Sequence, residues 1–195
     1  MTDERIIKIL KDSGVLLEGH FILTSGRHSN KYMQCAKLFE STDYSEELCK
    51  ELSEKYKDSN IDVVIGPAMG AVLMAYEVSR HLHVRNFFTE RENGQMVLRR
   101  GFSLKEGMRV LIVEDVVTTG GSVREVMDIV RKEGAVVAGI GSIVDRTGGG
   151  EIDFGVSFKA VISLKIESWE VENCPLCKME NATPPMKPGS RSLTK

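Results

Sequence analysis

The feature that most constrains this chain is a short apolar run followed by two acids and a polar, glycine-containing turn. The run covers residues 110–113 (VLIV), and Glu114 and Asp115 follow it directly. Its β-branched residues predict a central parallel strand that is buried on both faces. Residues 116–122 (VVTTGGS) predict a turn, and apolar residues at helical spacing follow from Val123. A strand, a polar turn and a helix in this order direct backbone N–H groups at a phosphate.

The two acids narrow the choice of ligand. A turn that held phosphate alone would not place two negative charges at its mouth, because they would repel the ligand. They suit a ligand that also offers ribose hydroxyls, together with a divalent cation that offsets the charge. The chain contains neither G-x-x-x-x-G-K-[ST] nor G-x-G-x-x-G. The pattern favours a ribose 5-phosphate over a nucleoside triphosphate or a dinucleotide; the alternative is an ordinary strand and capped helix with both acids in solvent.

Residues 113–122 (VEDVVTTGGS) resemble the phosphoribosyl pyrophosphate (PRPP) signature of type I phosphoribosyltransferases. The resemblance implies an α/β fold with a central, mostly parallel sheet flanked by helices, a small N-terminal hood and a flexible hairpin lid. It also implies that Glu114 and Asp115 are catalytic, because they would accept from the ribose hydroxyls and balance positive charge on the sugar. The remaining PRPP contacts would come from Val116, Val117, Thr118, Thr119, Gly120, Gly121 and Ser122.

A second segment points to one branch of this family. Residues 24–32 (TSGRHSNKY) predict by themselves only a β-hairpin turn. After an N-terminal helix over 4–13, however, this Ser-Gly-x-x-Ser-x-x-Tyr pattern resembles that of orotate phosphoribosyltransferases. The resemblance implies that Ser25, Gly26 and Tyr32 frame orotate, with Thr118 beside them.

Arg146 stands just beyond an apolar strand predicted over 135–144. An arginine at this edge of the sheet can bind a carboxylate bidentately, and orotate carries one. The resemblance therefore makes Arg146 the leading candidate for orotate recognition. The alternative is a surface pair with Asp145, which usually contributes little.

The pyrophosphate of PRPP would meet two other segments. Residues 66–71 (GPAMGA) predict a loop between a strand over 61–65 and a helix from Val72. The resemblance implies that Ala68, Met69 and Gly70 contact pyrophosphate here. Many orotate enzymes carry a lysine in this loop and this chain does not, so the contact must come from the backbone.

Residues 90–101 (ERENGQMVLRRG) lie between two predicted strands, and their charge pattern alone predicts a solvated hairpin. The resemblance implies instead a mobile lid, since the reaction needs closure against water. Arg91 would contact PRPP, and Arg99 and Arg100 would be catalytic by neutralising the departing pyrophosphate. Because the family's lid closes over a neighbouring subunit's site, a homodimer is also implied.

Chain length and net charge limit the number of domains and the classes of partner that we expect. The 195 residues suit one α/β domain, which we expect over 1–169 with the hood over about 1–38 and a tail over 170–195. The net charge of −2 gives no basic footprint for nucleic acid. No apolar run is long enough to span a membrane, and the N-terminus lacks a signal-peptide layout. With Cys35 and Cys49 isolated in sequence, we expect a cytoplasmic protein.

The tail contains Cys174-Pro175-Leu176-Cys177, and one C-x-x-C is half a tetrahedral zinc site. No second pair and no histidine follows downstream, so we favour a tail without metal. Two copies of the chain could complete a site across a dimer, which stays an alternative.

The expected reaction is transfer of the ribosyl phosphate of PRPP to N1 of orotate, which gives orotidine 5′-monophosphate and pyrophosphate in pyrimidine synthesis. The resemblance implies Mg²⁺ held mainly by substrate and water, without direct protein ligands. Three alternatives stay open: a purine phosphoribosyltransferase, a regulator that binds PRPP or nucleotides without turnover, and a purely structural α/β domain.

Overall fold

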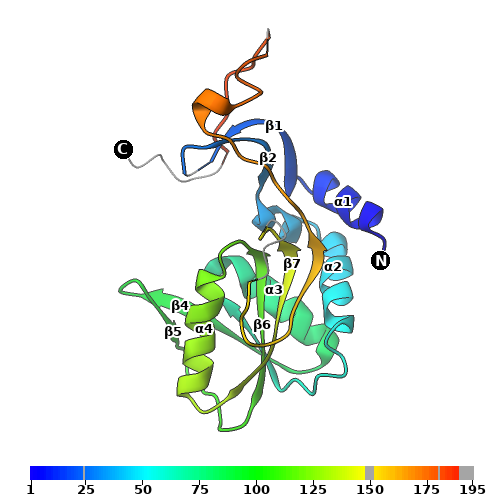
Figure 1. Ribbon diagram of the computed structural model, residues 1–195. Helices are drawn as coiled ribbons and strands as arrows, with labels where there is room; N and C mark the ends of the chain where they lie inside the picture. Colours follow the sequence, from blue (N-terminus) through cyan, green and yellow to red (C-terminus); the bar gives the residue numbers. More distant parts are fainter. Residues whose placement is uncertain (24, 148–151, 180, 189–195) are drawn as a thin grey trace.

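The computed structural model describes residues 1–23, 25–147, 152–179 and 181–188, and shows a six-stranded sheet with a separate two-stranded hairpin above it (Figure 1). The strand order in the large sheet is β5-β4-β3-β6-β7-β8, in which only β5 is antiparallel to its neighbour. This arrangement confirms the predicted mostly parallel sheet. Residue 24 of the predicted hairpin turn and residues 189–195 of the tail lie outside the described residues.

The elements follow one another in the order of an α/β unit preceded by a helix and a hairpin. They are α1 (Asp3–Asp12), β1 (Leu16–Ile22), β2 (His28–Met33), the 3₁₀ helix η1 (Cys35–Glu40), α2 (Thr42–Glu54), β3 (Val63–Pro67), α3 (Ala68–Leu82), β4 (Arg85–Glu92), β5 (Gln95–Leu98), β6 (Arg109–Val117), α4 (Gly121–Lys132), β7 (Val136–Asp145), β8 (Phe158–Ser163) and the 3₁₀ helix η2 (Val171–Asn173).

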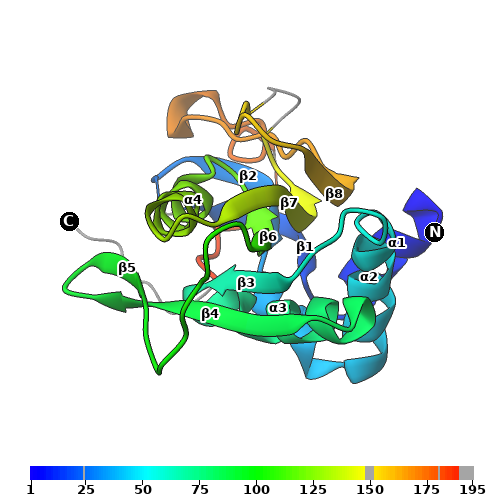
Figure 2. The same cartoon turned by 90° about the horizontal axis from the view of Figure 1, so that it is seen from below.

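Helices cover both faces of the sheet (Figure 2). Because side chains alternate along a strand, Leu111 and Val113 of β6 pack in a core with α2 and α3, whereas Val110 and Ile112 pack in a second core with α4. All four are fully buried. β6 is therefore the doubly covered central strand that its sequence predicts, and it fixes where its carboxyl end emerges.

The sequence prediction of a loop over residues 66–71 is wrong. Gly66 and Pro67 belong to β3, and α3 begins at Ala68, four residues before the predicted start. Pro67 has φ −72° and ψ 129°, so it leaves the strand directly into the helix. Proline lacks an N–H group, and this position needs none. A Gly-Pro pair therefore marks a strand end here without adding a loop.

The hairpin β1–β2 is bordered on both edges by the C-terminal segment, residues 165–179 and 181–188. His28 forms a bridge with Trp169 on one edge, and Phe21 forms a bridge with Met186 on the other (Figure 1). Two apolar stretches, residues 15–17 (VLL) and 20–23 (HFIL), separated by Glu18 and Gly19, predict two short strands, and this prediction is wrong. The structure has one strand with an irregularity between Glu18 and Phe21.

None of the helices in the described part of the chain combines the length and the apolar character that crossing a membrane requires.

Candidate active site

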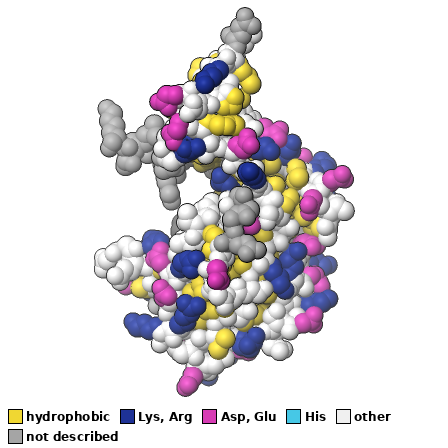
Figure 3. Space-filling view, in the orientation of Figure 1, with side chains coloured by type: hydrophobic (Ala, Val, Ile, Leu, Met, Phe, Trp, Pro, Cys, Tyr) yellow, Lys and Arg dark blue, Asp and Glu magenta, His cyan; other side chains and the backbone are white. Residues whose placement is uncertain are grey.

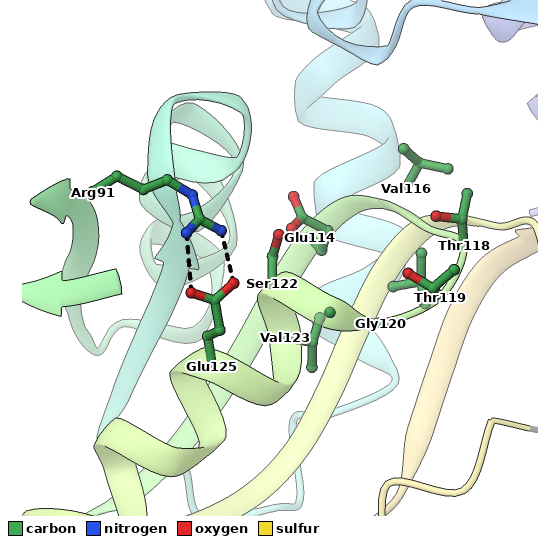
Figure 4. A pocket seen from close by; sticks show the side chains of 11 residues that line it. Arg91, Glu114, Val116, Thr118, Thr119, Gly120, Ser122, Val123 and Glu125 are labelled. Atoms are coloured by element: carbon green, nitrogen blue, oxygen red, sulfur yellow. Dashed lines mark hydrogen bonds and ion pairs between the residues drawn. The ribbon is translucent and has the colours of Figure 1, made fainter. Parts of the chain in front are cut away.

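A cavity of about 300 Å³ opens at the carboxyl end of β6, where the chain turns into α4 (Figure 4). Ligand sites of parallel sheets lie at this edge. The lining comes from the strand end, the turn, the first turns of the helix and one hairpin arginine: Arg91, Glu114, Val116, Val117, Thr118, Thr119, Gly120, Gly121, Ser122, Val123 and Glu125.

The N-terminus of α4 faces this cavity without a side-chain cap. Gly120 occupies the N-cap position with φ 73°, a left-handed conformation that favours glycine. A Cβ atom there would also lie 2.7 Å from the Phe154 ring, so no larger residue fits. By contrast, Thr2 caps α1 and Ser41 caps α2. The uncapped N–H groups of α4 are therefore available to an anion.

Glu114 and Asp115 lie side by side on β6 and point to opposite faces of the sheet. Glu114 lines the cavity with α4. Asp115 lies toward the start of α3, where a Cβ atom built on Gly70 would stand 3.4 Å from Asp115 Oδ2. The glycine therefore keeps the space beside this carboxylate open.

Both acids are partly buried, and neither forms an ion pair within the described residues. Burial, together with the neighbouring Asp115 charge, raises the pKa of Glu114 to about 8. Burial also raises the pKa of Asp115. A bound cation, or several hydroxyl donors, would stabilise the ionised form of both acids and so offset the cost of burying them. The residues present therefore fit a site for a metal-bound polyhydroxyl ligand.

Arg146 follows β7 and lies next to the turn, since its backbone N–H donates to the Val117 carbonyl at 2.8 Å. Its Nε atom is buried without a hydrogen-bond partner. Burial lowers the pKa of Arg146, and the nearby Cys35 and Tyr32 oppose that shift. Asp145 does not pair with it: its carboxylate accepts from Ser163 Oγ at 3.0 Å and from the Thr147 N–H at 2.8 Å. Arg146 thus has an unused donor near Tyr32.

The hairpin arginines are engaged with acids. Arg91 lies opposite Glu125 of α4 at 2.7 Å, which attaches the β4–β5 hairpin to the edge of the cavity (Figure 4). Arg99 pairs with Glu92 at 3.2 Å, and Arg100 pairs with Glu90 at 2.8 Å.

The structure therefore brings Arg91 to the cavity, while Arg99 and Arg100 stay within their own hairpin. Sequence reasoning missed Glu125, because a glutamate on an exposed helix face carries no signal of its own.

The predicted orotate-binding turn forms the tip of the β1–β2 hairpin. Gly26 has φ 82° and its N–H donates to the Leu23 carbonyl at 2.9 Å. Tyr32 lies on β2, with its ring 5.8 Å from that of Phe21. Neither Ser25 nor Gly26 lines the described cavity, so their predicted role rests on the sequence pattern alone.

Surface charge does not suggest a polyanion-binding face in this view. Lysines and arginines are interspersed with acids over the surface in Figure 3, and apolar side chains are visible both on the part above the sheet and between the charged side chains below it. The distribution agrees with the net charge of −2.

A parallel sheet, an uncapped helix start and two acids at the same strand end define a class of sugar-phosphate transferase. The family model described as "Phosphoribosyl transferase domain" matches residues 39–176, which include β6, the turn and Arg146.

Individual relatives identify the branch. The chain is 54% identical over 193 residues to the orotate phosphoribosyltransferase of Pelotomaculum thermopropionicum, which covers 99% of this chain and all of the relative. It is 53% identical over 193 residues to that of Caldanaerobacter subterraneus subsp. tengcongensis, with the same coverage. The crystal structure of orotate phosphoribosyltransferase from Aeropyrum pernix has a TM-score of 0.69 at 27% identity, covering 82% of this chain and 93% of that one. The chain belongs to the orotate phosphoribosyltransferase family.

Proposed function

We propose that this chain transfers the ribosyl 5-phosphate group of PRPP to N1 of orotate, producing orotidine 5′-monophosphate and pyrophosphate. Full-length relatives named for this reaction support the assignment. The structural observation that carries it is the pair of partly buried acids, without cation partners among the described residues, beside an uncapped helix N-terminus. A purine enzyme and a non-catalytic regulator share the fold, but the relatives at half identity carry neither name.

The turn would hold the 5′-phosphate. The side chains of its exposed residues Thr118 and Thr119 line the cavity (Figure 4), and residues 120–122 line it at the start of α4, where N–H groups lack a side-chain cap. No basic side chain belongs to this turn, so backbone dipoles would supply the positive potential. Val116 and Val117 would contribute main-chain contacts from the strand end.

Glu114 and Asp115 would accept from the ribose 2′- and 3′-hydroxyls. As the bond from C1 to pyrophosphate lengthens, the sugar gains positive charge, and ionised acids placed beforehand stabilise that charge. A bound Mg²⁺ would neutralise pyrophosphate and favour ionisation of both acids. We infer that substrate and water hold it for the most part, as is common for this ion.

Arg146 would pair with the orotate carboxylate through its unused Nε donor and its terminal nitrogen atoms. Tyr32 lies close enough to Arg146 to affect its pKa, and it would border the pyrimidine ring of orotate. Thr118 would lie on the other side of that ring, with Ser25 and Gly26 over it. Orotate N1 entering as an anion requires no general base, so catalysis would rest on positioning and charge stabilisation.

Pyrophosphate would meet the first turn of α3 through the backbone of Ala68, Met69 and Gly70. Helix α3, like α4, has no side-chain cap, because proline occupies its N-cap position. Arg91 already lines the cavity, where it pairs with Glu125, and it would contact PRPP from there. Arg99 and Arg100 would exchange their glutamate partners for pyrophosphate when the β4–β5 hairpin closes as a lid.

Three further proposals come from the family resemblance. The lid would complete the site of a second subunit, so the working unit would be a homodimer. The chain would act in the cytoplasm, and the free thiols of Cys35 and Cys49 suit a reducing compartment. Residues 1–169 would form one domain with a hood over about 1–38, followed by the tail over 170–195.

The test is a direct assay of substrates. Loss of orotate absorbance on mixing the protein with PRPP and Mg²⁺, with stoichiometric pyrophosphate release, is the expected result. Turnover of adenine, guanine or xanthine in place of orotate would contradict the substrate assignment. Uptake of PRPP with no turnover of any base would support the regulator instead.

A further inference from the structure

Two histidines of the hairpin and two cysteines of the C-terminal segment meet in one cluster, far from the cavity lining. Their ligand atoms all lie within 4.8 Å of one another. His20 Nε2 is 3.6 Å from both Cys174 Sγ and Cys177 Sγ, and His28 Nδ1 is 3.2 Å from Cys177 Sγ. The two ring nitrogens lie 2.9 Å apart. We propose that these four side chains bind one structural zinc ion.

The distances suit a tetrahedral ion. With Zn–S near 2.3 Å and Zn–N near 2.05 Å, tetrahedral angles place sulfur and nitrogen ligands about 3.5 Å apart and two nitrogens about 3.3 Å apart. Three of the four sulfur–nitrogen distances are 3.2, 3.6 and 3.6 Å, and the fourth is within 4.8 Å. The two nitrogens, 2.9 Å apart, need to separate by only a few tenths of an ångström. Four protein ligands complete the coordination, so no position is left open for a substrate, as in structural rather than catalytic sites.

A hydrogen bond orients His20 for this role. Its Nδ1 donates to the Thr183 carbonyl at 2.8 Å, which leaves Nε2 as the atom with a free lone pair. Nε2 is the atom that faces the other three ligands. Histidine ligands to metals commonly donate their second nitrogen to a carbonyl in this way.

Burial argues against an ordinary polar cluster. His20 is 6% exposed, His28 4% and Cys174 0%. Without an ion, the two imidazole rings share a single hydrogen bond, and the two thiols beside them are weak hydrogen-bonding groups. The other group with metal-binding residue types, Glu46, Glu77 and His81, differs because it is not buried and its acids already pair with Arg80. A mixed thiolate and imidazole set selects zinc over the hard cations.

The surrounding fold needs such a cross-link. A two-stranded sheet is marginally stable alone. Among its described residues, the C-terminal segment that borders it contains only a three-residue 3₁₀ helix and isolated bridges. In Figure 1 both lie above the main sheet, and the hairpin joins the first core only at its base, through Leu16 and Met33. An ion held by His20 and His28 on one side and Cys174 and Cys177 on the other would fix the segment across the hairpin.

Metal content is the first test. The full chain, purified without a histidine tag from zinc-replete medium, should contain one zinc per chain by mass spectrometry of the metal. Cys177→Ser, at the most exposed of the four ligands, should weaken zinc binding about 100-fold or more, since ligand loss exceeds the usual effect of a lost supporting bond. Cys49→Ala, a cysteine outside the cluster, should keep the full equivalent of zinc.

Cobalt substitution and unfolding give independent readouts. The Co²⁺-loaded protein should show tetrahedral d–d bands and a thiolate-to-cobalt charge-transfer band, the latter reduced in Cys177→Ser. A chelator should lower the melting temperature of the wild type by about 10 °C and leave that of Cys177→Ser unchanged. Wild-type protein without zinc and without the cobalt spectrum, a Cys174–Cys177 disulfide in the purified chain, or equal zinc affinity in Cys177→Ser would each overturn the proposal.

Discussion

At the scale of single residues, three ionisable side chains of the site lack a partner of opposite charge within the described residues. Arg146 has a buried Nε without an acceptor, and Glu114 and Asp115 are partly buried acids without a cation among the described residues. Unpaired buried charges cost stability. Their presence around one strand end is therefore explained by ligands that supply the missing partners.

The Arg146 side chain gives a prediction in which binding and stability change in opposite directions. Arg146→Ala should raise the KM for orotate about 10- to 100-fold, since a charge-assisted hydrogen bond contributes about 1.5–3 kcal/mol. The KM for PRPP should change little. The ligand-free variant should be as stable as the wild type or more so, because a partly buried cation with an unpartnered Nε atom is removed.

Arg146→Lys is the matched control, because lysine keeps the charge but lacks the planar fork. It should bind orotate with intermediate strength. Equal increases in both KM values, or a large fall in melting temperature for the alanine variant, would mean that Arg146 has a structural role instead.

Glu114 gives a prediction about pH. Its pKa is raised to about 8 in the folded, ligand-free protein and has its ordinary value of 4.5 when unfolded. The unfolded state therefore loses this proton first, and the folded protein loses stability as the pH rises from about 4.5 to about 8. Glu114→Gln removes this loss. The variant should gain on the order of 1–2 kcal/mol relative to the wild type at pH 8, with little gain at pH 4.5.

Chemical denaturation at several pH values measures this difference. An equal effect of Glu114→Gln at both ends of the range would contradict the raised pKa. Since the site would bind PRPP and Mg²⁺ with Glu114 ionised, ligand binding below pH 8 should also release a proton, which calorimetry in buffers of different ionisation enthalpy detects.

At the scale of elements, the turn between β6 and α4 depends on one glycine. Gly120→Ala adds a methyl group 2.7 Å from the Phe154 ring and places alanine at φ 73°. We expect a loss of about 3 kcal/mol or more in the free energy of unfolding, from strain and overpacking together. Gly155→Ala is the control, since its φ is 70° but nothing lies near its Cβ position. It should lose only about 1–2 kcal/mol. Equal losses would show that the contact with Phe154 is not tight.

The sequence predicts the elements that a local pattern determines. The β6 strand, its turn and α4 follow from a continuous apolar run, a polar turn and then apolar residues at helical spacing, and the structure confirms them. The start of α3 was missed because a Gly-Pro pair indicates a turn, whereas here it ends a strand directly before a helix.

Contacts between distant segments could not be read in this way. The sequence contains no further metal-binding cysteine or histidine downstream of Cys174 and Cys177, while His20 and His28 lie near the other end of the chain. Only the packing of the C-terminal segment on both edges of the β1–β2 hairpin brings them together. The glutamate partners of Arg99 and Arg100 likewise depend on how the β4–β5 hairpin folds back.

At the scale of the whole molecule, the proposed homodimer predicts that the lid of one subunit serves the site of the other. Arg99 and Arg100 pair with acids of their own hairpin and do not line the cavity of the described chain. A lid that acts on a neighbouring subunit would account for the position of these arginines apart from the cavity. This arrangement can be distinguished from closure within one chain by heterodimers of defined composition.

The first heterodimer combines Asp115→Asn in one subunit with Arg99→Ala and Arg100→Ala in the other, isolated through two different affinity tags. If the lid acts on the neighbouring subunit, one site contains intact acids and receives an intact lid, so the heterodimer should show about half of the wild-type activity. Each homodimer should be nearly inactive.

The reciprocal heterodimer places all three substitutions in one subunit beside a wild-type partner. Its intact acids then receive the altered lid, and its intact lid serves the altered acids, so activity should be nearly absent. Closure within one chain reverses both results, because the second heterodimer would keep about half of the activity and the first would lose it. Since the two heterodimers carry the same substitutions in total, a difference between them reflects only where the lid acts and not how much each change destabilises the fold.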